Sequence, residues 1–299
     1  MNWYLAAFIA TVLYSLYYYA LKLIGVRRLE QGRILFVQNL SLLSLAFVVL
    51  WLSGHELIVS APLFGLAVLN SLFFVGTQVM RVRAMKSVPA SLTYAVSKSG
   101  VVLVILWAWF LRAERPTFVG WIGVLLSLLA LACSVWPRAA GISSAGGERR
   151  WGGGLSAAAL SAALSAGTAI SLKEALHGTG LAEQLSFTIV GYVTLVVAQP
   201  LVSYVSRGSW LTPSREVHVP SVGAWIVIGG VMGLLLFVAF LALASAYRTG
   251  NLVAVTLLQG NATVFATLLV WAYPGEERTW REIMALVGSG LATVAFAIG

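Results

Sequence analysis

Val88-Pro-Ala-Ser-Leu-Thr-Tyr-Ala-Val-Ser-Lys-Ser-Gly-Val-Val-Leu-Val-Ile-Leu-Trp-Ala-Trp-Phe-Leu111 is an apolar stretch that contains one charged side chain, Lys98. About ten residues separate Lys98 from either end, so in a helix that crosses a bilayer it lies close to the midplane. A cation at that depth costs between about 3 and 17 kcal/mol. Such a cation persists only where it faces protein or water, and we therefore predict that Lys98 lines a functional cavity.

The composition of the whole chain agrees with a membrane setting. Of its 299 residues 60% are hydrophobic and 10% are charged, whereas soluble domains carry about 25% charged residues. Apolar runs of about 20 residues recur along the chain, and each is long enough to cross a bilayer as a helix. The sequence therefore predicts an all-α, polytopic membrane protein.

The net charge of +9 does not indicate a nucleic-acid partner, because the basic residues stand at the ends of apolar runs and form no polybasic cluster. The single cysteine, Cys133, allows no disulfide within the chain. The first apolar run begins at Trp3 without a basic segment before it and is too long for the core of a signal peptide. We expect this first span to be retained.

The apolar runs predict ten transmembrane helices, joined by short loops. The longest connection, from about Pro137 to Arg150, is rich in Gly, Ser and Ala and is typical of a linker. We expect the helices at residues 3–26, 34–53, 57–80, 88–111, 117–136, 152–176, 184–206, 221–247, 251–274 and 279–299.

The two halves of the chain resemble each other. The first helix ends in Ala20-Leu-Lys22 and the sixth in Ser171-Leu-Lys173. Five helices per half is an odd number, so the second half must insert upside down relative to the first, with a binding site expected at the midplane between them. The predicted organisation is a first five-helix repeat at 1–137, a linker at 138–150 and a second repeat at 151–299.

A second pair of motifs follows the fourth and ninth helices, where Trp107-Ala-Trp109 precedes Glu114-Arg-Pro116 and Trp271-Ala-Tyr273 precedes Glu276-Glu-Arg278. With this layout the chain resembles the EamA-type transporters of the drug/metabolite transporter (DMT) superfamily. The resemblance implies a secondary transporter of small metabolites, such as amino acids, organic anions or phosphorylated sugars, that works by alternating access. It also implies a bacterial inner-membrane protein, monomeric or homodimeric, without a cofactor.

The distribution of positive charge predicts an orientation. Most Lys and Arg residues, among them Arg28, Arg81 and Arg150, follow the odd-numbered helices. Cytoplasmic loops carry an excess of Lys and Arg, so these loops should be cytoplasmic and both termini should face outward.

Polar side chains in the fourth and ninth helices share faces with helical spacing. Tyr94 lies one turn before Lys98, and Ser97 is adjacent to it. We expect these residues and three from the ninth helix to bind the solute, and the alternative is that they only hydrogen-bond helix to helix. The three are Thr256, Gln259 and Asn261.

The first and third helices contribute further candidates. Tyr14 and Tyr18 share a face and are predicted to bind an apolar part of the solute, although tyrosines also form interfacial belts. Asn70 and Gln78 are polar residues deep in the third helix and complete the expected site. Lys173 lies near a helix end, from which a lysine side chain can reach the membrane surface.

Acidic residues are absent where a cation exporter would need them. The chain has no aspartate, and its ten acidic residues, all glutamates, fall in predicted loops or at helix ends. Proton-coupled export of cations requires a carboxylate within the membrane. With Lys98 as the charge at the midplane, we expect an anionic or zwitterionic solute.

An enzymatic function is not expected. His55, His177 and His218 fall in separate loops, so no metal site is predicted, and no phosphate-binding Gly-Lys-Ser/Thr motif is present. Ser97 and Lys98 point about 100° apart on a helix, which does not suit a nucleophile and its base. Two alternatives to solute transport stay open: a flippase for a lipid-linked head group, with membrane lipid as partner, and a non-transporting membrane subunit.

Overall fold

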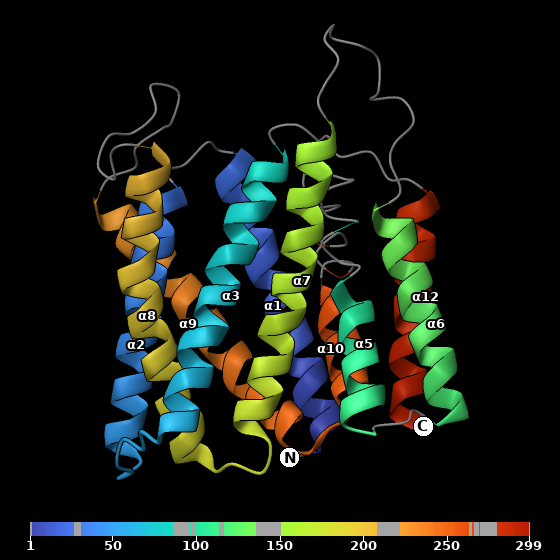
Figure 1. Ribbon diagram of the computed structural model, residues 1–299, viewed down its shortest axis with the longest axis horizontal. Coiled ribbons are helices and arrows are strands. Elements are labelled where there is room, and N and C mark those ends of the chain that lie inside the picture. Colours follow the sequence, from blue (N-terminus) through green and yellow to red (C-terminus); the bar gives the residue numbers. More distant parts are fainter. Residues whose placement is uncertain are drawn as a thin grey trace, which may run out of the picture.

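The computed structural model describes residues 2–26, 31–85, 96, 100–113, 117–135, 151–207, 222–262, 265, 269 and 280–298. Within these residues the fold is all-helical, and the helices lie side by side along one direction with both termini at the same end (Figure 1). The helices are α1 (Trp3–Val26), α2 (Gln31–Leu52), α3 (Ala61–Met85), α5 (Gly100–Leu111), α6 (Phe118–Val135), α7 (Trp151–Leu176), α8 (Leu181–Arg207), α9 (Val222–Thr249), α10 (Leu252–Gly260) and α12 (Trp280–Ile298).

These ten described helices fall at the predicted positions. Helix α1 has the predicted bounds, and α5 and α10 are the described parts of the expected fourth and ninth spans. Five of the described helices are long and apolar enough to cross a membrane: Arg33–Leu52, Ala61–Arg81, Gly153–Leu176, Leu181–Pro200 and Val222–Thr249. The expectation of an all-α membrane protein is therefore confirmed.

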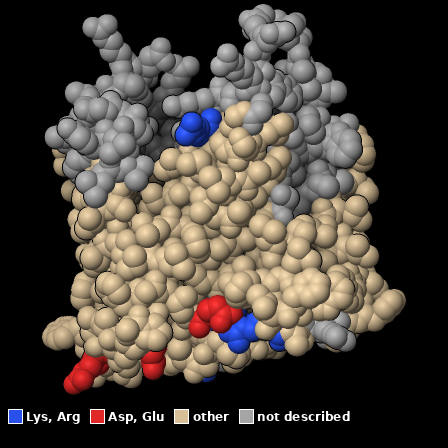
Figure 2. All heavy atoms as spheres, in the orientation of Figure 1, with Lys and Arg blue, Asp and Glu red and all other residues tan. Residues whose placement is uncertain are grey.

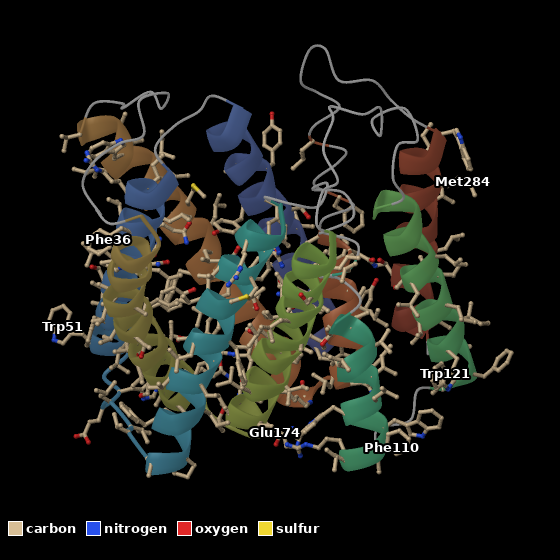
Figure 3. All side chains as sticks on the ribbon, turned by 45° about the horizontal axis from the view of Figure 1, so that its top comes forward. Phe36, Trp51, Phe110, Trp121, Glu174 and Met284 are labelled. Carbon is tan, nitrogen blue, oxygen red and sulfur yellow. The ribbon has the colours of Figure 1, made fainter. Side chains whose placement is uncertain are left out.

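The surface of the bundle has the pattern of a membrane protein. The face drawn in Figure 2 has a broad band without Lys, Arg, Asp or Glu, and charged side chains gather near its lower edge. Exposed aromatic side chains stand at helix ends on this side of the bundle, with Trp51 near the end of α2, Phe110 near the end of α5 and Trp121 near the beginning of α6, and Figure 3 shows them pointing outward. Aromatic residues prefer the boundary between hydrocarbon and head groups, so this end of the bundle, where both termini lie, meets a membrane surface.

The helices pack in a regular pattern. The most extensive contacts join α3 to α7, α1 to α9, α2 to α9, and α6 to α12. Helix α8 packs against both α2 and α3, and α5 and α10 contact each other. The largest cluster of buried apolar residues extends through these contacts.

Glycine permits the closest approaches between helices. At Gly233 on α9 a Cβ atom would lie 2.8 Å from the carbonyl oxygen of Gln38 on α2. At Gly100, the first residue of α5, a Cβ atom would collide with the backbone of Ala162 on α7. Small residues that bring backbones together are a common basis of helix association in membranes.

Candidate functional site

Five tyrosines from three helices lie near one another inside the bundle: Tyr14, Tyr17 and Tyr18 of α1, Tyr192 of α8 and Tyr247 of α9. Tyr14 on α1 is 9% exposed and stacks on Tyr18, with ring centroids 6.2 Å apart and planes 29° apart. Its hydroxyl is within electrostatic range of Tyr192 on α8 and Tyr247 on α9. The two predicted residues thus belong to a larger aromatic cluster that also includes Tyr17, Tyr192 and Tyr247.

The tyrosine cluster continues onto α10 through a hydrogen bond. The hydroxyl groups of Tyr247 and Thr256 lie 3.0 Å apart, and Tyr247 is fully buried. Helix α10 starts just after α9, with Asn251 capping its first turn by accepting a bond from the Ala254 amide. The predicted residue Thr256 is therefore held against the cluster by its neighbour on α9.

Asn261 lies at the C-terminal end of α10, and its side chain has no hydrogen-bond partner among the described residues. Its backbone amide donates to the carbonyl groups of Leu257 and Leu258, yet its side chain is 0% exposed and both Oδ1 and Nδ2 lack a hydrogen bond. The Thr11 hydroxyl lies 2.8 Å from the Ala7 carbonyl of its own helix, α1, and 3.0 Å from the Leu258 carbonyl, so its single proton is shared between α1 and the end of α10. Gln259, also predicted, is half-buried beside this end.

The unpaired amide of Asn261 is energetically unusual. Buried polar groups in proteins almost always have a partner, and leaving one without a hydrogen bond costs about 1–3 kcal/mol. If Asn261 served only to join helices, it would bond to one of them. An unpaired donor and acceptor on one buried side chain instead suit a partner that arrives from outside the protein, such as a solute or a water molecule.

Asn70 on α3 has a different environment from Asn261. Its Nδ2 donates to the Thr168 carbonyl at 2.7 Å and to the Ser171 hydroxyl at 3.0 Å, both on α7. These bonds hold α3 against α7. Gln78 lies about two turns further along α3 and is exposed. The two candidates on this helix therefore differ, since Asn70 is bonded to α7 and Gln78 lies at the surface.

Three of the predicted residues, Tyr94, Ser97 and Lys98, lie outside the described residues. The nearest described position beyond them is Gly100, which sets the beginning of α5 against α7. Helix α5 also contacts α10, the helix that ends beside Asn261. The predicted proximity of the fourth and ninth helices is thus present in their described parts.

Lys173 on α7 is buried, although its position near a helix end predicted that it could reach the membrane surface. It is 2% exposed, and its Nζ donates to the carbonyl oxygens of Tyr247 at 2.9 Å and Gly250 at 2.6 Å. Those carbonyls end α9, where the helix dipole favours a positive charge. Lys173 therefore joins the end of α7 to the end of α9.

The next residue, Glu174, forms an ion pair. Arg112, just after α5, donates through Nε to Glu174 Oε1 at 2.7 Å and through its Nη2 to Glu174 Oε2. Figure 3 shows Glu174 at the lower end of α7, near the end of α5 that carries Phe110. Among the described residues no group of three or more His, Cys, Asp or Glu could hold a metal ion.

Some members of this region had only a weak signal in the sequence. Tyr192 is an isolated tyrosine in the middle of an apolar span, a position like that of Tyr14, and this likeness could have marked it. Tyr247 lies at a helix end and reads as a belt residue, so only the tertiary structure identifies it. Thr11 is a single hydroxyl in an apolar helix, which is common and carries little information.

Comparison with known proteins agrees with this architecture. A solved structure described as "Crystal structure of protein" matches with a TM-score of 0.77 and 19% sequence identity, covering 99% of this chain and 96% of that chain. At that identity the likeness shows the fold alone. No curated protein matches the chain.

A family model adds a likeness in sequence. Residues 1–136 match the EamA-like transporter family, the same family that the motifs after the fourth helix predicted. The match ends just after α6 and includes α1, which carries Tyr14 and Tyr18. Over residues 1–136 the chain is therefore similar to the EamA-like transporters, and its apolar helices are long enough for an integral membrane protein.

Proposed function

We propose that this protein is a secondary transporter that carries a small anionic or zwitterionic solute across the membrane by alternating access. The observation that carries the proposal is Asn261, a fully buried side chain with an unpaired donor and an unpaired acceptor, at the end of α10. Thr256 lies on the same helix and leads to the tyrosine cluster. An apolar aromatic wall beside a few convergent polar groups is the usual form of a small-molecule site.

Two inverted repeats, at 1–137 and 151–299 with a linker at 138–150, are part of this proposal. If each helix is exchanged for its counterpart in the other half, the α3–α7 contact becomes the α9–α1 contact, and α2–α9 becomes α8–α3. The α2–α8 and α6–α12 contacts map onto themselves. Helices α1 and α7, the first of each half, run in opposite directions (Figure 1). These relations support a pseudo-twofold axis in the membrane plane.

Charge supports an anionic or zwitterionic solute. The sequence has no aspartate, and the described glutamates near the ends of α7 and α8 are engaged, Glu174 with Arg112 and Glu183 with the Gly180 amide. Lys98 supplies positive charge near the middle of its span in the sequence. We propose that Lys98 binds the anionic group and that Asn261 binds a second polar group of the same solute.

Because both termini lie at one end of the bundle (Figure 1), a single orientation assay applies to both. We propose that they face outward in a bacterial inner membrane, as the charge distribution predicts. A tag at Met1 that is reached only after the membrane is opened would contradict this orientation.

The transport proposal is tested with purified protein in two steps. A thermal-shift screen against a metabolite panel identifies the solute, because a ligand that binds the folded state stabilises it. Uptake of that solute into proteoliposomes is then measured for Lys98→Gln and Asn261→Leu, with Asn70→Leu as the matched control. We expect Lys98→Gln to lose at least about tenfold in uptake at limiting solute, because it removes a charge-assisted hydrogen bond. Asn261→Leu should lose about threefold to tenfold, because it removes neutral hydrogen bonds, and Asn70→Leu should keep its solute dependence.

Each other result identifies a different function. Transport that requires the solute to be lipid-linked would favour the flippase. If Lys98→Gln and Asn261→Leu change stability but leave uptake unaltered, these residues are structural and the proposed site is wrong. If no solute from any class shifts the unfolding temperature or crosses the membrane, the non-transporting subunit is favoured.

A further inference from the structure

The packing pattern divides eight of the described helices into two groups that do not follow the two halves of the chain. Group A comprises α1, α2, α9 and α10, and group B comprises α3, α5, α7 and α8. Each helix makes its most extensive contact within its group, except that α8 contacts α2 of group A as extensively as α3 of group B. Helices α6 and α12 pair with each other and belong to neither group. Each group therefore takes two helices from each half.

The polar contacts follow the same division. Thr11 bonds from α1 to α10 and Tyr247 from α9 to α10, within group A. Within group B, Asn70 bonds from α3 to α7, Ser71 from α3 to the Gly191 carbonyl on α8, and the Arg112–Glu174 pair joins the end of α5 to α7.

The closest glycine contacts also stay within a group. Gly233 and Gly229 lie against α2, whereas Gly100, Gly167 and Gly191 each lie against another helix of group B. Contacts of this kind lock helices at short distance and resist sliding. These contacts indicate two rigid bodies, and each body contains helices from both halves of the chain.

Lys173 crosses from one group to the other. It stands on α7 in group B, and it binds the carbonyl groups of Tyr247, in the last turn of α9, and of Gly250, just after α9, on the side of group A. Nearby in the same half of the bundle, Phe187 of α8 stacks on Phe240 of α9 with ring centroids 6.4 Å apart. At the opposite half the groups meet through Asn39 on α2 and Gln199 on α8, 2.6 Å apart.

We infer that Lys173 is a latch that holds groups A and B together at the end of the bundle where the termini lie. The inference rests on the proposed transport function and adds the moving bodies and the contact that must break. The ammonium group makes charge-assisted bonds to two carbonyls at a helix C-terminus, where the dipole adds to the attraction. When the groups separate at this end, water takes the place of the carbonyls, so the bonded and the separated states are discrete alternatives.

The other half of the chain has a lysine at the matching position. Ala20-Leu-Lys22 at the end of α1 corresponds to Ser171-Leu-Lys173 at the end of α7. The pseudo-twofold exchanges α7 for α1 and α9 for α3, so the counterpart of the end of α9 is the end of α3 at Met85. From this correspondence in the sequence alone, we propose Lys22 as the latch of the opposite end in the conformation in which Lys173 is released.

The test reads conformation by thiol accessibility and does not depend on transport. Leu176 follows Lys173 by one turn of α7 and is 0% exposed, so Leu176→Cys reports opening at the end that carries the termini. The reporter is built with Cys133→Ala, and its rate of reaction with a polar maleimide is measured in detergent. Adding Lys173→Met should raise that rate by about tenfold or more, and Lys173→Arg should keep it within about threefold of the parent.

Lys22→Met is the second variant, and its predicted effect has the opposite sign. Without the opposite latch the population shifts toward the state in which Lys173 is engaged, so labelling of Leu176→Cys should slow. The Lys22→Met measurement keeps the inference testable even if Lys173→Met does not fold. Arg112→Gln is the control: it removes an ion pair at the same end but within group B, and it should leave the labelling rate unchanged.

The outcomes separate the latch from the transport function. Equal labelling in Lys173→Met and its parent, with both proteins folded by thermal unfolding, would overturn the latch even if solute uptake is observed. Faster labelling in Lys22→Met would overturn the pairing of the two lysines. Conversely, opposite shifts in the two lysine variants would support the latch even if no solute in the panel is transported.

Discussion

Polar side chains are paired in the seam between α3 and α7, whereas the Asn261 side chain is unpaired at the end of α10. In the seam, the Asn70 amide finds the Thr168 carbonyl and the Ser161 hydroxyl donates to the Thr77 carbonyl at 3.2 Å. At the end of α10, the Asn261 side chain has no partner although it is completely buried. The same residue type, asparagine within a membrane span, therefore joins helices in one region and stays unpaired in the other.

This difference separates structure from function within one bundle. A polar group that is paired inside the protein contributes to folding, and natural sequences have no reason to keep an unpaired one unless something else binds it. The seam is the fixed part of group B, whereas the end of α10 is where we place the solute. Substitutions in the seam should therefore change mainly stability, whereas substitutions at the end of α10 should change mainly transport.

The largest effect is expected from overfilling the seam. At Gly167 on α7 a Cβ atom would lie 2.7 Å from the ring of Phe73 on α3. Gly167→Leu should therefore lower the free energy of unfolding by about 3 kcal/mol. Denaturation in mixed micelles measures the change, and Gly153→Leu, at a position on α7 with open space around it, is the control. Equal stability of the two variants would show that the seam is loosely packed.

A smaller loss is expected when the seam loses its bonds. Asn70→Leu removes the donor to Thr168 and Ser171 and should lower the free energy of unfolding by about 2 kcal/mol. The same denaturation measurement applies. Ser171→Ala, which removes only one of the two partners, should cost less; if it costs as much as Asn70→Leu, the carbonyl bond contributes nothing.

At the end of α10 the sign should reverse. Asn261→Leu replaces an unpaired polar group by an apolar one of similar size and should raise the free energy of unfolding by about 1 kcal/mol in the absence of solute. Stabilisation by the solute should be lost in the same variant. If Asn261→Leu is less stable than the parent protein, Asn261 has a structural role, as Asn70 does, and the proposed difference between the two asparagines is wrong.

The smallest effect is expected at the hydroxyl pair of α9 and α10. Thr256→Val breaks the bond to Tyr247 and should lower the free energy of unfolding by about 0.6 kcal/mol. A double-mutant cycle with Tyr247→Phe isolates the pair. Additive effects of the two substitutions would show that the 3.0 Å contact contributes no stability and leaves Thr256 available to the solute.

The sequence predicted the helices well because apolar length is a direct requirement of the bilayer. Helix α1 has the predicted bounds and α7 starts within a residue of its predicted start. The division into groups A and B could not be predicted, since it depends on which glycines meet which backbones. Gly233 and Gly230 are alike in the sequence, yet only Gly233 lies against α2.

The site was predicted less completely than the helices, because its contacts also depend on which helices pack together. Tyr14 and Asn261 were selected as candidates from polar side chains on helix faces, and both are buried in the structure, but the sequence could not tell that Asn70 is paired and Asn261 is not. Lys173 was placed near the membrane surface because it stands at a helix end, whereas the carbonyls at the end of α9 hold it inside. Partners distant in the sequence decide these outcomes.

The interleaving of the two groups bears on how the protein is made. While the first 137 residues are being synthesised, Asn70 and Ser71 of α3 have no access to their acceptors on α7 and α8, which come later in the chain. The early helices must remain in the bilayer, or with an insertion factor that shields them, until the late helices arrive. A nonsense mutation in the linker would leave the first half of the chain without the helices that it packs against. Supplying residues 151–299 as a separate polypeptide should then complete the fold.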